Sequence, residues 1–347
     1  MHKKVTLGRP LNLDNIAETF NEVSKALLVR RDLLNTWTDN LVDPELGPVG
    51  KDFHAAFVNA ECKEFLGLKT THNALFNSYA YPPFEGEEAF KNQIVYGTTV
   101  LDDAALLFSA RCHEIIHALQ YVHAPALHAD PFNAETEAFI SPRDYLLRKE
   151  RIEQDAYAKG AWLCTLATDD HPDIREKMDS SMLSVKKFEE LRAQHGNLHA
   201  ALTAGAHAAA NTLGVWVTNG PKTTAADNWH HLALKEYEAI IDRRLKDGKS
   251  ITFVRMEDND VLALGQSFGP NPFAAADGTL DPSFRQPSSF GEDIEKRLAT
   301  LNAKIGITDE TALPTLGSTI KNTHASRQEF LTAMRTPRKV ENIRPDT

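Results

Sequence analysis

The fold of this chain is decided by the stretch Arg111-Cys112-His113-Glu114-Ile115-Ile116-His117-Ala118-Leu119-Gln120. On a helix, His113 and His117 are four positions apart and project from one face, with their Cβ atoms about 5–6 Å apart. Two neutral imidazoles at that spacing can bind one Zn²⁺ ion at about 2.0–2.1 Å each. Glu114 lies beside them, close enough to act as a general base on a water molecule at the metal.

The residues around this stretch predict the helix that carries it. Asp102 and Asp103 suit the N-cap, and Pro125 closes the helix. Apolar residues recur near the helical period of 3.6, at Ala104, Leu107, Phe108, Ile115, Leu119 and Val122. Cys112 is expected to be a small buried residue on another face of this helix and not a metal ligand.

Composition narrows the class of protein. The chain has 347 residues, of which 42% are apolar and 25% charged, as in an ordinary globular protein. The net charge of −10 argues against a nucleic acid or an anionic membrane as partner. Its 3 cysteines form no disulfide framework. There is no evident secretory signal and no run of about 18 apolar residues, so we expect a cytoplasmic protein that does not span a membrane.

The pattern along the chain predicts a mainly α (α+β) fold. Ile94–Val100 is the best strand before the motif, since it is rich in β-branched residues. It is either an edge strand that pairs with an extended substrate or a core strand. Residues 67–92 are expected to be irregular, and 250–254 to form a short strand. Helices are expected at 13–38, 51–66, 142–168, 172–194, 198–213, 225–246, 291–304 and 318–335.

A shift in composition suggests where the chain divides. From about residue 268 it becomes rich in Gly, Pro, Ser and Asp. We therefore predict an N-terminal helical segment (1–45) that packs on the core, a central domain (46–267), and a linker followed by a helical C-terminal extension (268–347).

A catalytic zinc site needs a third protein ligand, and Glu153 is the first candidate. His117 lies about eight residues, or about 12 Å, before the end of its helix. Glu153 lies about eleven residues, or about 17 Å, into the helix that Ser141 and Pro142 begin. If the two helices are antiparallel, these residues come nearly level. Gly160 and Ala156 are small enough to let the helices approach closely.

Other third ligands remain open. His123 completes the metzincin spacing H-E-x-x-H-x-x-G-x-x-H, except that Gln120 stands where that pattern has glycine. The glycine lets the helix turn back, whereas a left-handed conformation costs glutamine about 1–2 kcal/mol. On an unbroken helix, His123 is rotated about 240° from His117. Glu135 or Glu137, in the loop that follows, could also reach the metal.

The motif and the Glu-x-x-Ala of the following helix resemble the gluzincins, the zinc peptidases with a glutamate as third ligand. Glu153-Gln154-Asp155-Ala156 is also similar to the Glu-x-Asp-Ala pattern of a poorly characterised bacterial metallopeptidase family. The likeness covers about residues 94–168. It implies a zincin-like helical core with a short edge sheet, with His113, His117 and Glu153 as Zn²⁺ ligands and Glu114 as general base. Tyr157 stands where many gluzincins have an aspartate, so Asp155 or Asp103 is expected to support the ligands instead.

The expected function is zinc-dependent cleavage of peptide bonds, with a peptide or protein as substrate and no nucleic acid or membrane partner. Donors to the oxyanion would come from Tyr157, Tyr121, Tyr145, His230 or His231, although the two histidines are expected to lie on a helix surface. Two alternatives stay open: a catalytically degenerate regulatory or scaffold protein, and a zinc amidohydrolase acting on a small amide. The pattern leaves substrate and oligomeric state open.

Overall fold

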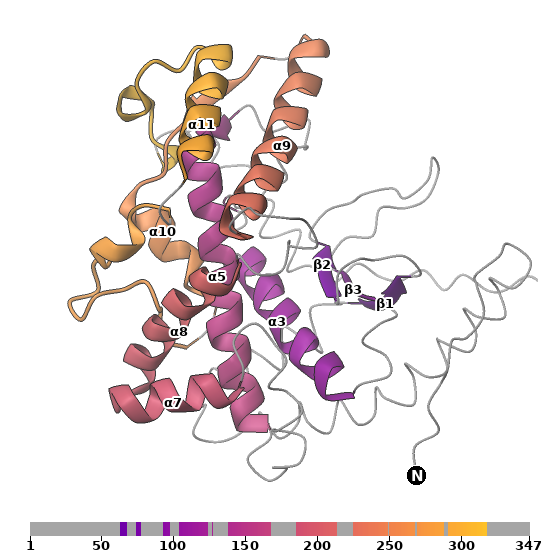
Figure 1. Ribbon diagram of the computed structural model, residues 1–347, viewed down its shortest axis with the longest axis vertical. Helices are drawn as coiled ribbons and strands as arrows, with labels where there is room; N and C mark the ends of the chain where they lie inside the picture. Colours follow the sequence, from indigo (N-terminus) through magenta and orange to yellow (C-terminus); the bar gives the residue numbers. More distant parts are fainter. Residues whose placement is uncertain are drawn as a thin grey trace, which may run out of the picture.

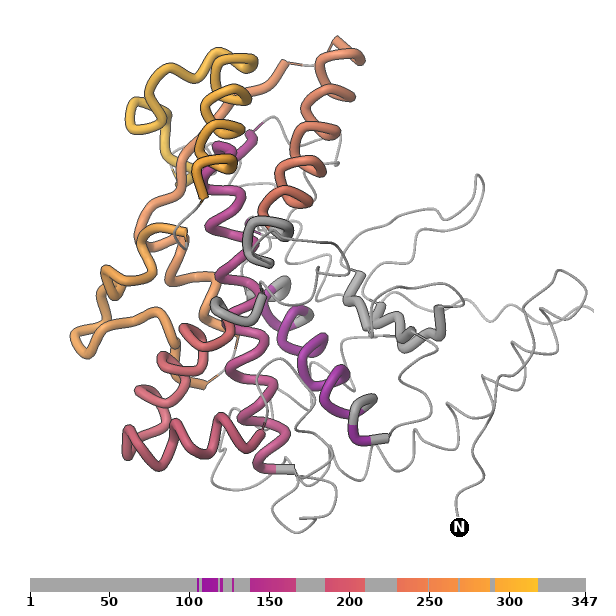
Figure 2. Tube along the Cα trace, in the orientation of Figure 1, coloured from indigo at the N-terminus to yellow at the C-terminus, as the bar shows by residue number. Residues whose placement is uncertain are grey.

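The computed structural model describes the segments drawn in colour or as ribbon elements in Figures 1 and 2. These are residues 63–67, 74–77, 93–97, 104–123, 127, 138–167, 185–213, 225–248, 250–267, 269–287 and 291–317. The described part is mainly helical. Its longer helices are α3 (Ala104–His123), α5 (Pro142–Ala167), α7 (Val185–His195), α8 (Leu198–Leu213), α9 (Ala225–Lys246), α10 (Asp258–Leu264) and α11 (Glu292–Ile305). The mainly α expectation is confirmed at this level.

Helix α5 runs through the middle of the helical assembly, and the other helices pack around it (Figure 1). It begins where the sequence predicts, with Ser141 before it and Pro142 as its first residue. The Ser141 hydroxyl accepts a hydrogen bond from the backbone N–H of Asp144 at 3.3 Å, which satisfies one of the donors left free in a first helical turn. Pro142 lacks a backbone N–H, so its place at the start costs no helical hydrogen bond.

Helices α3 and α5 lie side by side and antiparallel. Contacts run in opposite order along them, since His113 meets Gly160 whereas Gln120, further along α3, meets Ile152. A Cβ atom at Gly160 would lie 3.4 Å from the backbone Cα and N of His113. The absence of a side chain there lets the α5 backbone rest directly on the α3 backbone beside the motif.

Two small sheets accompany the helices. Strand β3 (Gln93–Gly97) lies between β1 (Lys63–Gly67), which is parallel to it, and β2 (Ala74–Asn77), which is antiparallel. The predicted strand is confirmed over 94–97. It is the central strand of this sheet, so the edge-strand alternative is wrong. A second sheet pairs β4 (Ala138–Ile140) with β5 (Thr252–Val254) in parallel.

Two local expectations in this region are wrong. Residues 63–66 belong to β1, whereas a helix was expected over 51–66, and residues 51–62 lie outside the described part. Residues 74–77 form β2 inside a stretch expected to be irregular. Short strands of this kind owe their structure to pairing with a neighbour, which a pattern along one segment does not reveal.

Several of the later elements match their predicted bounds, whereas helix α10 was not expected. Helices α8 and α9 and strand β5 are confirmed, and α11 differs from its expected bounds by one residue at each end. Helix α7 occupies only the second half of the expected 172–194 helix, and residues 168–184 lie outside the described part, as do the expected helices at 13–38 and 318–335. No described helix combines the length and apolarity needed to cross a membrane.

The segment 269–287, which follows α10, packs on the same core as the motif helix. Phe273 and Phe284 are fully buried in the apolar cluster that also contains Ile116 of α3. Gly269 adopts a left-handed φ of 62°, and a Cβ atom there would lie 2.8 Å from the ring of Trp162. This segment is thus held by tertiary contacts, while the division of the chain into domains stays a prediction.

Replacing Gly160 with leucine should separate α3 from α5. An overpacked contact of this kind typically costs about 1–3 kcal/mol of unfolding free energy, measurable by urea denaturation of the full chain. Gly160→Ala is the matched control, since its gain in helix propensity of about 1 kcal/mol offsets a 3.4 Å contact. An unchanged unfolding midpoint for Gly160→Leu would show that the two backbones do not touch at this position.

Candidate metal centre

Three side chains from α3 and α5 converge on one point. His113 Nε2 lies 3.0 Å from His117 Nε2 and 3.3 Å from Glu153 Oε2, and His117 Nε2 lies 3.7 Å from the same oxygen. The two imidazole rings are nearly perpendicular, with centroids 4.6 Å apart. The structure therefore brings together the two motif histidines and the first of the predicted third ligands.

These separations fit the edges of a tetrahedron around one ion. A zinc ion bound to nitrogen and oxygen at about 2.0–2.2 Å requires its ligand atoms to lie about 3.3–3.6 Å apart. The observed separations of 3.0, 3.3 and 3.7 Å bracket that value. His113, His117 and Glu153 can accordingly hold a metal ion.

The chemistry of the three atoms also calls for a cation. A carboxylate oxygen and two imidazole nitrogens that face one another present lone pairs, and lone pairs at these distances repel unless a proton or a metal lies between them. The side chains of both histidines are 13% exposed and that of Glu153 is 26% exposed. The centre is therefore largely sheltered from solvent, and Glu153 is its most exposed member.

The pKa values of His117 and Glu153 also indicate that the centre favours a positive charge. Burial by itself lowers the pKa of His117, but the carboxylates of Glu153 and Glu114 outweigh it and raise this pKa to about 9. Burial works in the opposite sense on Glu153, and the neighbouring His117 and His113 overcome it and hold the pKa of this carboxyl well below its usual range. Without a metal, the centre thus retains a proton at neutral pH.

Glu114 lies at this centre as the motif predicts. Its side chain is buried, with 5% of its surface exposed. Besides its influence on His117, its negative charge contributes to the raised pKa of Tyr157, after the larger effects of burial and of Glu153. These two effects place the Glu114 carboxylate within electrostatic range of His117 on α3 and of Tyr157 on α5.

Tyr157 packs against the first ligand. Its ring centroid lies 4.2 Å from that of His113, with the two planes tilted by 36°. It is one turn of α5 beyond Glu153, so both side chains reach the same side of the helix. Burial raises the pKa of Tyr157 well above its usual value, and its hydroxyl therefore keeps its proton at neutral pH.

A chain of hydrogen bonds connects His117 to buried residues of α5. His117 Nδ1 lies 2.9 Å from the side-chain oxygen of Gln120, whose Nε2 donates to Asp155 Oδ2 at 2.9 Å. Asp155 forms an ion pair with Lys159 at 2.8 Å, and both side chains are completely buried. Of the two acids expected to support the ligands, Asp155 does so through Gln120, whereas Asp103 lies outside the described residues. The contact between Gln120 and His117 was not predicted from the sequence. A spacing of three residues on one helix places two side chains on the same face, and this could have indicated the contact.

Of the alternative third ligands, the structure bears only on the backbone of His123. Helix α3 continues unbroken through His123, so the bend that the metzincin pattern needs is not made at Gln120. Glu135 and Glu137 lie outside the described residues. Cys112 is buried with 1% exposed, as expected.

Two of the expected oxyanion donors serve elsewhere. His230 is 2% exposed and its Nε2 lies 2.6 Å from the buried carboxylate of Glu150, so the expectation of a surface position is wrong. Tyr145 donates its hydroxyl hydrogen to Glu236 of α9 at 2.9 Å. Partners this distant in sequence cannot be read from a local pattern. Tyr157 contacts His113 through its ring, and the side chain of Tyr121 lies outside the described part of the chain.

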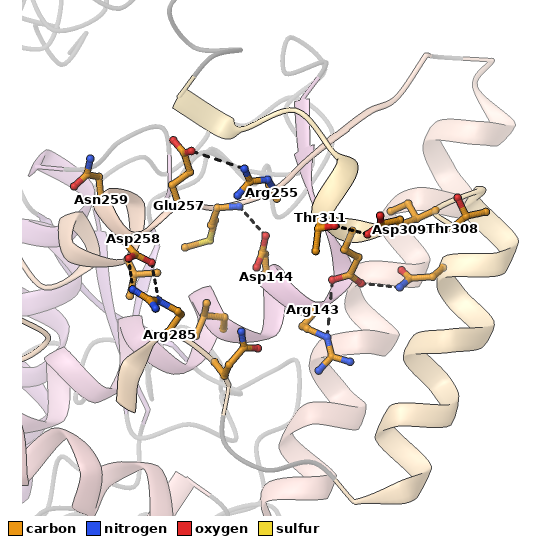
Figure 3. Close-up of a pocket in the computed structure, with 17 residues that line it drawn as sticks. Arg143, Asp144, Arg255, Glu257, Asp258, Asn259, Arg285, Thr308, Asp309 and Thr311 are labelled. Carbon is orange, nitrogen blue, oxygen red and sulfur yellow. Dashed lines mark hydrogen bonds and ion pairs between the residues drawn. The ribbon is translucent and has the colours of Figure 1, made fainter. Parts of the chain in front are cut away.

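A cavity of about 890 Å³ opens near the N-terminal end of α5 (Figure 3). It lies between Asp144, the first residues of α10 and the turn after α11, and charged side chains of both signs line it. Asp144 is nine positions before Glu153, which places it about 14 Å away along the axis and on the opposite face of α5. The three metal-binding candidates do not line this cavity, so it is separate from the centre.

Comparison of the chain with known protein families, with curated proteins and with solved structures gives no match.

In the metal-free protein, Glu153→Gln should lower the pKa of His117 from about 9 toward its ordinary value of 6.5, because the variant removes the largest charge that opposes the effect of burial. A raised histidine pKa stabilises the fold below pH 6.5, and this stabilisation is lost as the pH rises through 9. The parent should lose up to about 1.4 kcal/mol of unfolding free energy per pH unit across that window. NMR titration of the histidines and denaturation at several pH values measure both.

The matched control is Glu190→Gln, which changes an exposed carboxylate of α7 that pairs with Lys187. It should leave the pKa of His117 at about 9. A parent pKa near 6.5 would contradict the convergence of Glu153 on His117.

Proposed function

We propose that this chain is a zinc-dependent hydrolase that cleaves peptide bonds in a peptide or protein substrate. The observation that carries the proposal is the tetrahedral spacing of His113 Nε2, His117 Nε2 and Glu153 Oε2, at 3.0, 3.3 and 3.7 Å, around a motif that also holds a buried glutamate. Two histidines and one glutamate are the donor set of many catalytic zinc sites.

The ligand set favours zinc on grounds of charge and donor type. Imidazole nitrogen and carboxylate oxygen suit Zn²⁺, which accepts four-coordinate geometry readily. With Zn²⁺ bound, two neutral imidazoles and one carboxylate would leave a net charge of +1 at the centre. The bound ion would therefore still be able to act as a Lewis acid. A zinc ion held there supplies a Lewis acid that polarises a carbonyl group and makes water acidic near neutral pH.

The residues of this chain supply the proton transfers and the orientation. Glu114 accepts a proton from the attacking water and delivers it to the nitrogen of the departing amine. Its burial excludes bulk water from the carboxylate, which makes the transfer to the reacting groups more direct. Tyr157, which keeps its proton, donates a hydrogen bond to the oxyanion that develops on the substrate carbonyl.

The substrate does not pair with β3, which is already bonded to a strand on each side. The main chain of the substrate is therefore bound by other parts of the protein. A regulatory protein with a vestigial motif would need no buried glutamate within electrostatic range of the three converging side chains. The presence of Glu114 there supports the hydrolase over that alternative.

The variant Glu114→Gln should keep the zinc content of the parent but lose peptide hydrolysis by at least about 10²-fold, since general acid–base catalysis is worth about 10²–10⁴-fold. Elemental analysis measures the zinc, and a mixture of fluorogenic peptides measures the hydrolysis. His117→Ala should lose both. Glu190→Gln, far from the centre, should lose neither.

Full hydrolysis by Glu114→Gln would remove the glutamate from the mechanism. A full zinc content in His117→Ala would place the metal elsewhere in the chain. Zinc binding by the parent with no hydrolysis of any peptide, but with hydrolysis of small amides, would favour the amidohydrolase alternative.

A further inference from the structure

The side-chain amide of Gln120 has a partner for each of its groups. Its Nε2 donates one hydrogen to the backbone carbonyl of Ile152 at 2.9 Å and the other to Asp155 Oδ2 at 2.9 Å. Its Oε1 lies 2.9 Å from His117 Nδ1. The side chain is completely buried, so no solvent molecule competes for these groups.

This arrangement fixes which way the amide points. Rotating the amide by 180° would place its oxygen against the Ile152 carbonyl and the Asp155 carboxylate, which are both acceptors. An unpaired acceptor pair in a buried site costs about 1–3 kcal/mol for each group. The oxygen therefore faces His117 and can only accept from it.

A fixed acceptor at Nδ1 determines the tautomer of a neutral His117. The proton must be on Nδ1, which leaves the lone pair on Nε2, the atom that lies 3.7 Å from Glu153 Oε2. The ring is held at the same time against rotation about its own axis. This is the state in which a histidine binds a metal through Nε2.

Asp155, which accepts a hydrogen bond from Gln120, has further polar partners of its own. Lys159 donates hydrogen bonds to the Gly265 carbonyl at 2.8 Å and to the Ser267 hydroxyl at 2.9 Å, and its ammonium group forms an ion pair with Asp155 Oδ1 at 2.8 Å. The Ser267 hydroxyl in turn donates to Asp155 Oδ2 at 2.6 Å. Asp155 thus cannot turn away from Gln120 without leaving a buried ammonium group short of a partner.

We propose that Gln120 is a positioning residue for the metal centre, which transmits the fixed orientation of the buried Asp155–Lys159 pair to His117 and commits His117 to binding through Nε2. This inference rests on the proposed function, because it assumes that the centre holds zinc. It assigns a role to the glutamine that stands where the metzincin pattern has glycine. That glutamine keeps α3 straight and supplies the support that an aspartate would otherwise give.

The first test needs no variant. In zinc-loaded parent protein labelled with ¹⁵N-histidine, long-range ¹H–¹⁵N spectra should show a proton on His117 Nδ1 and a metal-shifted resonance for Nε2. Binding of zinc through Nδ1 would overturn the inference. A parent that takes up no zinc would overturn both the inference and the proposed function, so the two failures are distinguishable.

The second test replaces Gln120 with methionine, which has a similar shape but neither the amide donors nor the oxygen acceptor. Loss of an outer hydrogen-bond partner typically weakens metal binding about 10–100-fold. Competition with a chromogenic chelator should show a zinc Kd raised by that factor. Parent-like affinity in this variant would overturn the inference.

The matched control is Gln154→Met, the same change at a glutamine that is 1% exposed and binds Arg151 at 2.7 Å. It should lower the melting temperature but leave the zinc Kd within about twofold of the parent, as expected of a position without a path to the metal. A loss of zinc affinity equal to that of Gln120→Met would show that general loosening of the helices explains both, and would overturn the inference.

Discussion

The direct contact of two helix backbones is the constraint on which the centre depends. Gly160 brings α5 against the backbone of α3 at His113, and the antiparallel course of the helices then sets every later pairing. With the axes this close, a glutamate side chain from one helix reaches two imidazoles on the other without an intervening loop. The ligand atoms are consequently placed by two long, rigid elements, which favours a precise geometry.

Buried charge is concentrated around this contact, and it is compensated within the described residues. Lys159 and Asp155 are fully buried, and together with Gln120 they form a chain of partners that ends at His117. A second buried group, Glu150 with His230 and Arg151, joins α5 to α9. Such pairs gain little net stability against an apolar core, but removing one partner is costly. They therefore specify one arrangement of the helices more than they strengthen it.

Much of the centre follows from the sequence because its logic is local. The motif fixes the positions of His113 and His117 on one helix, and a rise of 1.5 Å per residue is enough to bring Glu153 level with them. The role of Gln120 and the burial of His230 depend on partners 35 and 80 positions away, and no period within one helix reports such pairs. The strands at 63–67 and 74–77 were not predicted for the same reason, because each depends on its pairing with β3.

Lys159 donates hydrogen bonds to Gly265 and Ser267, which are synthesised much later than Lys159 itself. The centre can therefore reach its final state only after these later residues have been made. Helices α3 and α5 leave the ribosome about a hundred residues before these two partners do. Until then the ammonium group lacks these two acceptors, and the chain of contacts behind His117 is incomplete. Because domains are generally completed from the N-terminus during translation, a nascent chain would contain His113, His117 and Glu153 early but would complete the hydrogen bonds behind His117 only late.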